Sequence, residues 1–511
     1  MMDEATGDEE SSGSLATAMS GGMLVSASKV FALGFGYLTQ IVMARLLTQS
    51  GYGDVILTIA VINVTVLLAT LGLNDGLMRE FPNHEDDPKK ARGVVRAGLI
   101  TSVISGSVVA IAVFVSAPIF AREVFNDPSL AELIRVGAVG VPFIVLGKNA
   151  VALARGSRDA KPRAIVDQLI RPVLRFGFIA GLVIAGFGAL GAITGQIAAM
   201  SVAGLLVTAF ALRLLPSPFG ESTSMYRPIL AFSLPLIAVQ GMNFLNSSLD
   251  IYMIGYFLDS AQVGVYNIAL QLSNLTTVAL ITVAFLLPPI ITRLDKKGKQ
   301  KELLATYQGL TKWMMMLAVP IFVVLFFAPR IVINLLFGAK YTDGALVLQI
   351  VIVGKLVAIL SGLNFKSLIA LGDNRFVSYM MFAQLVLNFV ANYLLIPVYG
   401  IVGGAVALTL SAVAGDLLGA LVLFRQYDLH PLSLSLLVPV SLLGGIAGVG
   451  FVVTTVAGLP LWVVIIPLAV GYPIVVARFA IEPRDEMLLG LFEDRIGREL
   501  TPVRNVVNRL Q

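Results

Sequence analysis

Long runs of apolar residues alternate with short polar connections along nearly the whole chain. A helix that crosses a bilayer needs about twenty mainly apolar residues, and about fourteen segments meet this requirement. The predicted spans cover residues 20–47, 52–73, 94–117, 131–153, 164–186, 189–212, 229–257, 263–291, 306–328, 342–370, 376–397, 401–424, 433–457 and 461–480. A further apolar stretch, Ile331–Phe337, is too short to span and predicts a re-entrant or interfacial turn.

Lysine and arginine collect in every second connection between these spans. The connections after even-numbered spans hold Arg79, Lys89, Lys90, Arg92, Arg155, Arg158, Lys161, Arg163, Arg213, Arg227, Arg293, Lys296, Lys297, Lys299, Lys301, Arg375 and Arg425. The connections after odd-numbered spans hold Arg122, Arg330 and Lys340, and Arg45 closes the first span. Because basic loops stay in the cytoplasm, we expect a multi-pass protein of the cell membrane with both termini cytoplasmic.

The composition agrees with a chain that faces lipid. Of 511 residues, 57% are hydrophobic and 13% are charged, about half the charged share of a soluble protein. The net charge of +5 does not indicate nucleic-acid binding, since the basic residues lie between hydrophobic runs. The chain has no cysteine, and its two histidines, His84 and His430, stand alone in polar connections. We therefore expect no metal site, no cofactor and no catalytic cysteine or histidine.

The two ends of the chain differ from its apolar body. Residues 1–19 are acidic and rich in glycine and serine, which predicts a disordered cytoplasmic tail and no cleaved secretory signal. After Arg478 the chain predicts an amphipathic helix on the cytoplasmic interface, or a plain charged tail. The predicted divisions are the tail 1–19, a first lobe 20–215, a second lobe 216–425, two further spans 432–480 and the tail 481–511.

The chain contains a weak copy of itself. An offset of 211 pairs Gly53 with Gly264, and offsets of 216 and 212 pair Gln168 with Gln384 and Gly188 with Gly400. Each unit of the repeat holds six predicted spans, and an even number preserves orientation across the membrane. The fold expected is therefore all-helical, with two parallel six-helix repeats and two additional C-terminal helices, an arrangement typical of transporters.

Two kinds of motif resemble a known family. VMARLLTQSGYGDV, which begins at Val42, resembles the opening motif of the polysaccharide-type flippases of lipid-linked oligosaccharides. These belong to the multidrug/oligosaccharidyl-lipid/polysaccharide exporter superfamily. FGALGA from Phe187 and YGIVGG from Tyr399 resemble its repeated glycine motif. The resemblance covers residues from about Ser20 to about Ala480 and is less specific for the substrate than for the superfamily.

The resemblance implies a function and a partner. Such a protein moves a glycan linked to polyisoprenyl phosphate or pyrophosphate from the cytoplasmic to the outer leaflet of the membrane. In the family, spans one, two, seven and eight line a central cleft that opens alternately to the two sides. Basic side chains there hold the phosphate, while the lipid tail stays among membrane lipids. We expect no enzyme activity, no nucleic-acid partner and a monomeric transporter.

Basic residues inside the predicted spans are candidate phosphate ligands, because a charge in the bilayer usually faces a cavity or a partner. Lys29 lies about 14 Å into the first span, at ~1.5 Å per residue, and is either a phosphate ligand or half of an ion pair. Arg171 and Arg175 follow Asp167 on one helical face, where Asp167 and Arg171 form either part of the site or a structural pair. Lys148 and Lys366 lie in matching spans of the two repeats, and Arg45 lies at the end of span one. Each of these three side chains either binds the phosphate or extends to the membrane interface.

Polar residues in spans seven and twelve suit a glycan or a coupling ion. Asn243, Asn246 and Asp250 give span seven a polar stretch, and Asp416 lies in span twelve. Basic residues outnumber acids in the spans, which favours an anionic substrate. Two other functions are weighed against the flippase. A cation-coupled multidrug exporter of the same superfamily needs an acid where this chain has Lys29, and a membrane polysaccharide polymerase or glycosyltransferase needs a large external loop or a polar catalytic pair.

Overall fold

The computed structural model describes residues 28–157, 163–213, 220–276 and 287–451, together with Tyr472. Every regular element in these ranges is helical. The chain divides into two compact units, Met1–Gly264 and Val265–Gln511. The two predicted tails, 1–19 and 481–511, lie outside the described residues, as does the predicted span 461–480 apart from Tyr472.

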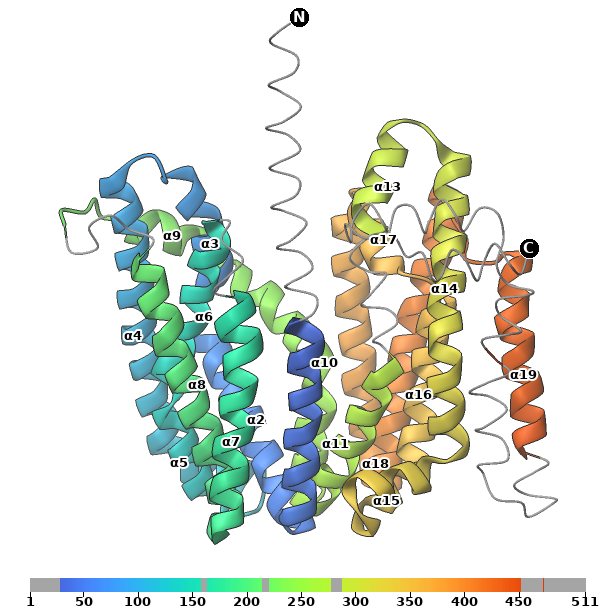
Figure 1. Cartoon of the computed structure of the whole chain (residues 1–511), viewed down its shortest axis with the longest axis horizontal. Coiled ribbons are helices and arrows are strands. Elements are labelled where there is room, and N and C mark those ends of the chain that lie inside the picture. The colour runs from blue at the N-terminus through green and yellow to red at the C-terminus, as the bar shows by residue number, and fades with distance from the viewer. Residues whose placement is uncertain (1–27, 158–162, 214–219, 277–286, 452–471, 473–511) are drawn as a thin grey trace, which may run out of the picture. The chain divides into compact units, whose positions relative to one another are not determined.

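The first unit is a bundle of helices that pack around α6 (Figure 1). A helix over residues 28–46 precedes α2. The elements that follow are α2 Gln49–Ala69, α3 Leu73–Asn83, α4 Pro88–Ile119, η1 Phe120–Val124, α5 Leu130–Val139, α6 Val141–Gly156, η2 Arg163–Ile170, α7 Arg171–Leu182, η3 Val183–Phe187, α8 Gly188–Arg213, α9 Tyr226–Ser233, α10 Leu236–Phe257 and the start of α11 Ser260–Ser273. Helix α6 contacts α3, α4 and α8, and α8 also packs against α7.

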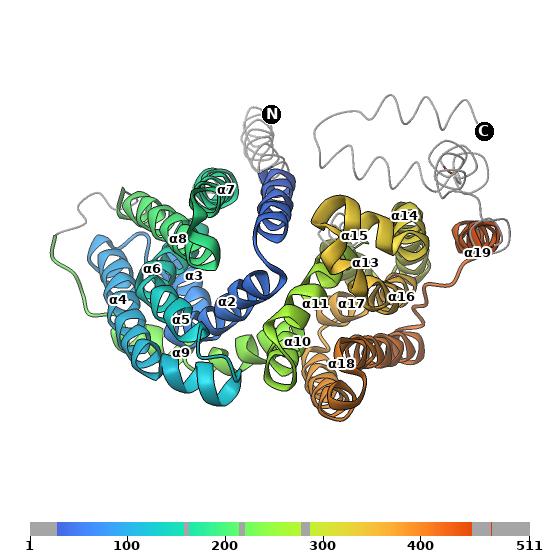
Figure 2. The ribbon, with the colours of Figure 1, turned by 90° about the horizontal axis from the view of Figure 1, so that it is seen from below.

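The second unit has its own bundle, in which α16 lies between α14 and α18 (Figure 2). Its elements are the rest of α11, η4 Asn274–Thr276, α13 Leu287–Lys296, α14 Gln300–Phe327, α15 Pro329–Phe337, η5 Ala339–Gly344, α16 Ala345–Leu360, α17 Asn364–Ala370, α18 Asn374–Tyr427, η6 Leu434–Leu436 and α19 Leu437–Phe451. Helix α17 packs against both α13 and α18. The stretch predicted to be too short to span forms α15, a helix of 9 residues.

Local sequence signals set several helix starts. Thr48 precedes α2, and its Oγ1 accepts a hydrogen bond from the Gly51 N–H at 3.0 Å. Asp87 precedes α4, and its Oδ1 accepts from the N–H groups of Lys89 and Lys90 at 3.1 and 3.2 Å. These bonds satisfy amides that the helix itself leaves unpaired, and the hydrogen bond from Lys90 is the largest of the effects that lower the pKa of the Asp87 carboxyl.

Two glycines break long apolar runs in the same way. Gly188 has φ 55° and ψ −137°, at the junction of η3 and α8. Gly400 has φ 60° and ψ −141°, and divides α18 into two helices. Residues with a Cβ atom rarely adopt this backbone conformation, whereas glycine adopts it without a steric cost. The breaks fall between the predicted spans 164–186 and 189–212, and between 376–397 and 401–424.

Within the described residues, six helices are long and apolar enough to cross a membrane, or up to eight if each bent pair is one span. One bent pair is α5 with α6, at 45°, and the other is α9 with α10, at 42°. The molecule is therefore a multi-pass, all-helical membrane protein. The predicted total of about fourteen spans stays a prediction.

The N-termini of α2 and α11 cross at close range within the first unit. A Cβ atom built on Gly53 would lie 1.6 Å from the carbonyl oxygen of Ser260, and one on Gly264 would lie 3.0 Å from that of Gln49. The offset of 211 that pairs Gly53 with Gly264 also pairs Gln49 with Ser260. Each helix thus presents its glycine to the other at matching positions.

Replacing Gly53 by alanine should destabilise the protein, because no side chain moves out of the way of a backbone carbonyl. We expect the free energy of unfolding to fall by about 1–3 kcal/mol, which is measured as a lower midpoint of thermal unfolding in detergent. Gly241→Ala in α10 is the matched control, since a Cβ there meets nothing within 4 Å. Equal midpoints for the two variants would show that the crossing is not tight.

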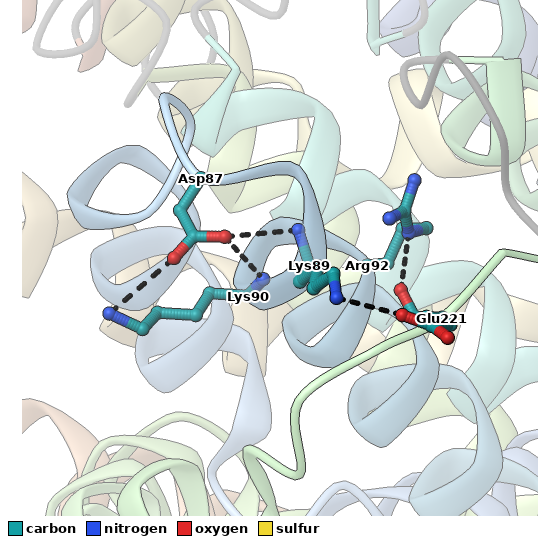
Figure 3. Close-up of polar contacts among 5 residues, drawn as sticks. All are labelled: Asp87, Lys89, Lys90, Arg92 and Glu221. Atoms are coloured by element: carbon teal, nitrogen blue, oxygen red, sulfur yellow. Dashed lines mark hydrogen bonds and ion pairs between the residues drawn. The ribbon is translucent and has the colours of Figure 1, made fainter.

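A polar segment ahead of α9 is attached to the start of α4 (Figure 3). Lys89 Nζ lies 2.7 Å from Glu221 Oε2, and Arg92 Nε donates to the Glu221 carbonyl oxygen at 2.7 Å. The Thr223 N–H donates to the Lys89 carbonyl at 3.0 Å. The exposed ion pair itself contributes about 0–1 kcal/mol. The backbone bonds add to it and fix the path of the chain into α9, which packs against α3 and α4.

Candidate functional site

A cavity of about 290 Å³ lies in the first unit among α3, α6, η2, α7 and α8. It combines the basic and acidic groups of three elements with an apolar wall from α8. Its lining residues are Asn74, Ile144, Gly147, Lys148, Val151, Ala152, Arg155, Asp167, Arg171, Met200, Ala203, Gly204 and Val207.

Three cations and one carboxylate face this cavity, which leaves a net charge of +2. Lys148 and Arg155 are seven residues apart on α6, and this spacing places them on one face of the helix. Arg171 Nη1 lies 2.6 Å from Asp167 Oδ1. The charge of Lys148 interacts with both partners of that pair. Lys148 and Arg155 are exposed, so their donors are accessible to a ligand that enters.

Glycines let α8 form the wall of the cavity. A Cβ on Gly147 would lie 2.6 Å from the Cα of Gly204, so α6 and α8 touch through their backbones. Val207 and Met200 of α8 line the same cavity. Because apolar walls lower the local dielectric, charge-assisted hydrogen bonds to an anion are stronger here than in water. The arrangement can bind an anion such as a phosphate group.

The described part of the first helix starts at Ser28, next to this site. Ser28 Oγ donates to Gln168 Oε1 at 2.6 Å, which joins this helix to the η2 segment that carries Asp167. Lys29 follows Ser28 and is exposed. It is not among the residues that line the described cavity.

Arg175 lies one turn beyond Arg171 on α7 and also outside the cavity lining. Among the described residues, its buried Nε has no hydrogen-bond partner. Its guanidinium lies near the charge of Arg171 and near Tyr52 of α2, whose hydroxyl donates to Gln40 Oε1 of the first helix at 2.7 Å. Arg175 therefore stands where three elements of the first unit meet.

Two other predicted phosphate ligands lie elsewhere. Arg45 is exposed near the end of the first helix. Lys366 lies on α17 of the second unit, where it lines a separate cavity. Of the six predicted phosphate ligands, the described structure brings Lys148 and Arg171 into one cavity.

The polar residues of spans seven and twelve range from exposed, at Asn243, to buried, at Asp250. The side-chain amides of Asn243 and Asn246 each donate to the carbonyl four residues earlier in α10, at 3.0 and 3.1 Å. Asp250 is 3% exposed. The backbone carbonyl of Asp416 accepts from Asn364 Nδ2 at 2.8 Å, and its carboxyl interacts with the charge of Lys355. A role for these four residues in binding a glycan or an ion stays a prediction.

Three residues of interest were not singled out from the sequence. Arg155 was assigned to a basic connection, yet its seven-residue spacing from Lys148 was available as a signal. Asn74 reaches the cavity from α3, and the sequence offers no signal for this. Lys312 is 1% exposed in α14, and its place inside the predicted span 306–328 was a signal of a buried charge.

The fold is that of a known class of membrane transporter. A structure titled as the lipid II flippase MurJ in an inward closed conformation matches with a TM-score of 0.67, at 14% identity, over 91% of this chain and 99% of that one. A multidrug resistance MATE family transporter of the MOP superfamily, in an inward-facing conformation, matches with a TM-score of 0.63, at 16% identity, over 80% and 98%. The chain therefore has the all-helical fold of these membrane proteins.

The family follows from the sequence match. Residues 42–346, more than half of the chain, match the family model described as polysaccharide biosynthesis protein. The chain belongs to this family. The predicted resemblance to polysaccharide-type flippases of the exporter superfamily is thereby confirmed.

Curated relatives are similar over part of their length. The probable low-salt glycan biosynthesis flippase Agl15 of Haloferax volcanii is 29% identical over 34% of this chain and 37% of its own. The lipopolysaccharide biosynthesis protein WzxC of Escherichia coli is 24% identical over 54% and 53%. The matched regions thus span between about a third and about a half of these relatives.

Proposed function

We propose that the protein is a flippase for a glycan linked to polyisoprenyl phosphate or pyrophosphate. It moves this glycolipid from the cytoplasmic to the outer leaflet of the cell membrane, for the assembly of surface polysaccharide or glycoprotein. It is a transporter and carries out no chemical reaction on its substrate. Membership in the polysaccharide biosynthesis family supports this proposal, as does the similarity to Agl15.

The cavity of the first unit carries the proposal. Lys148, Arg155 and Arg171 meet there against a single carboxylate, in an apolar helix bundle. Charges inside a membrane protein are costly, at about 2.5–3.5 kcal/mol each on insertion scales, and are usually retained for a function. A phosphate or pyrophosphate group supplies the negative charge that this cavity lacks. We assign the phosphate head to Lys148 and Arg171, and contacts earlier or later in transport to Lys29, Arg45, Arg175 and Lys366.

Transport is proposed to occur by alternating access between two parallel six-helix repeats, with about fourteen spans in all. The matching dihedral angles of Gly188 and Gly400 support the repeat, since offset-related residues adopt the same rare conformation. The reciprocal packing of Gly53 and Gly264 supports it independently. The lobes are proposed to cover 20–215 and 216–425, and the protein to act as a monomer.

A multidrug exporter is the second candidate, because the MATE transporter shares the fold. Coupling to a cation would need an acidic side chain available in the first lobe. Asp167, the acid of the described cavity, is held by Arg171 at 2.6 Å, and its neighbours are cations. A cation-binding drug site is therefore disfavoured there by charge.

Deletion of the gene in the native cells tests the function. We expect the lipid-linked oligosaccharide to be synthesised at normal levels but to accumulate on the cytoplasmic leaflet, with little glycan at the surface. Loss of the glycolipid itself would indicate an enzyme. Normal glycan display combined with new sensitivity to cationic drugs would indicate the exporter.

The proposed orientation is tested with single cysteines, since the chain has none of its own. Cysteine in place of Lys90 or Lys299 should react with a membrane-impermeant reagent only in inverted vesicles, because both lie in basic connections. Cysteine in place of Arg122, in a connection of the opposite set, is the control and should react in intact cells. Reaction of Lys90→Cys from outside intact cells would reverse the topology.

A further inference from the structure

A second basic cavity lies entirely within the second unit, between α13 and α17. Its volume is about 600 Å³, and it is lined by Pro288, Thr292, Arg293, Lys296, Lys366, Ile369 and Ala370. It shares no residue with the cavity of the first unit. The proposed transport of a glycolipid assigns a contact to Lys366 but uses none of the other residues in this lining.

Side chains four residues apart build one wall of this cavity. Pro288, Thr292 and Lys296 follow one another at that spacing on α13, so they share a face of the helix. Thr292 Oγ1 lies 3.1 Å from the carbonyl oxygens of Pro288 and Ala370, and its one hydroxyl hydrogen is shared between these two acceptors. The bond to Ala370 ties α13 to α17 and holds the two walls together.

The charges in this cavity have one sign. Arg293, Lys296 and Lys366 line it, and among the described residues no carboxylate does. Asp295 lies between the first two in sequence but is absent from the lining, and its charge interacts with Tyr427 instead. Arg293 and Lys296 are exposed, so their donors reach whatever occupies the open side. The occupant must therefore be an anion.

The apolar part of the lining identifies the kind of anion. Ile369 is 51% exposed and lies one turn from Lys366 on α17, beside Ala370 and Pro288. A free phosphate ion would leave this surface uncovered. A lipid with a phosphate headgroup satisfies both parts at once, because the headgroup pairs with the cations while the hydrocarbon covers the isoleucine.

We propose that the cavity between α13 and α17 binds the headgroup of an anionic phospholipid from the surrounding bilayer. Arg293 and Lys296 belong to the basic connection that the charge distribution predicts to be cytoplasmic, where anionic lipids attract Lys and Arg. Arg293 and Lys296 bind the phosphate, and Ile369 contacts the lipid chain. Of the residues in this lining, Lys366 alone is also assigned a contact with the transported glycolipid, and the binding of a lipid by Arg293 and Lys296 does not depend on the proposed function.

The test is lipid binding to the purified full-length protein, read as the midpoint of thermal unfolding in a neutral detergent. Three probes are titrated: a short-chain phosphatidylglycerol, a phosphatidylcholine of equal chain length, and inorganic phosphate. We expect phosphatidylglycerol to raise the midpoint at concentrations where the other two have little effect. The double variant Arg293→Gln/Lys296→Gln should require at least about tenfold more phosphatidylglycerol, since each cation contributes about 1 kcal/mol.

A matched variant separates the site from general electrostatic attraction. Lys297→Gln/Lys301→Gln removes the same charge from exposed positions of the same connection, outside the cavity lining, and should respond like the wild type. Ile369→Ser should weaken the response to phosphatidylglycerol and leave the response to inorganic phosphate unchanged. Equal responses of the two double variants to phosphatidylglycerol would show that the cavity is not the binding site. Equal midpoints with inorganic phosphate and with phosphatidylglycerol would show that the ligand is not a phospholipid.

Discussion

Lys148→Glu should abolish glycolipid transport while the protein is still made and inserted at the normal level. A charge-assisted hydrogen bond contributes about 1.5–3 kcal/mol, so its loss in Lys148→Ala should slow transport by roughly ten- to a hundredfold. The glutamate adds repulsion between its carboxylate and the phosphate, which should lower the rate further. The measurement is the rate at which labelled glycolipid appears in the outer leaflet, normalised to the amount of protein.

The control variant changes charge by the same amount outside the cavity. Lys297→Glu lies at an exposed position in a basic connection and should transport at close to the normal rate. Asp167 and Arg171 offer a second comparison, because their ion pair could be structural only. If the pair is only structural, the transport lost in Arg171→Gln should return in the double variant Asp167→Asn/Arg171→Gln, which leaves no unpaired charge. If Lys148→Glu transports the glycolipid at the wild-type rate, Lys148 does not bind the phosphate.

Lys29→Ala should insert normally and lose most of its transport activity, by about tenfold or more if the ammonium binds the phosphate directly. Removing a charge from a predicted span lowers the cost of insertion, so a folding defect is not the expected result. Lys29 is exposed, and the bond between Ser28 and Gln168 joins its helix to the candidate site.

Conservative and reversed variants of Lys29 distinguish a ligand from a neighbour. Lys29→Arg should keep part of the activity, because the charge is retained while the donor geometry changes. Lys29→Glu should be worse than alanine, because it opposes the charge of the phosphate. If Lys29→Ala is expressed and transports normally, Lys29 does not bind the phosphate, and the head group is bound by Lys148 and the arginines of the first unit.

Much of the helix pattern was predictable because the apolar runs and their interruptions are strong signals. The predicted span 52–73 corresponds to α2, Gln49–Ala69, and the interruption before residue 401 corresponds to the break at Gly400. The bends carried a sequence signal that the predicted spans did not use. The predicted span 131–153 is two helices at 45°, and 229–257 is another pair at 42°. Pro142 stands in the first turn of α6, and Pro235 directly precedes α10. A proline inside an apolar run commonly ends or kinks the helix there.

The candidate site was predictable only as far as it is local. Asp167 and Arg171 pair at 2.6 Å, as their four-residue spacing on one helical face indicated. The meeting of Lys148 with Arg171 depends on how α6 and α7 both pack against α8, which no short-range pattern specifies. Lys366 and Lys148 lie in matching spans of the predicted repeat, yet they line separate cavities with different linings. Similar spacing in a repeat does not guarantee a similar neighbourhood.

The central claim is that this protein moves a lipid-linked glycan across the bilayer, and purified protein in vesicles tests it most directly. Vesicles are prepared with a polyisoprenyl-phosphate-linked oligosaccharide in both leaflets, and an impermeant reagent added outside modifies every exposed glycan. With the wild-type protein, nearly all of the glycolipid should become modified over time. With Lys148→Glu, modification should stop at the share initially outside, as in vesicles without protein. If wild-type vesicles also stop at that share, under an imposed ion gradient as well as without one, the protein is not a flippase for this class of lipid.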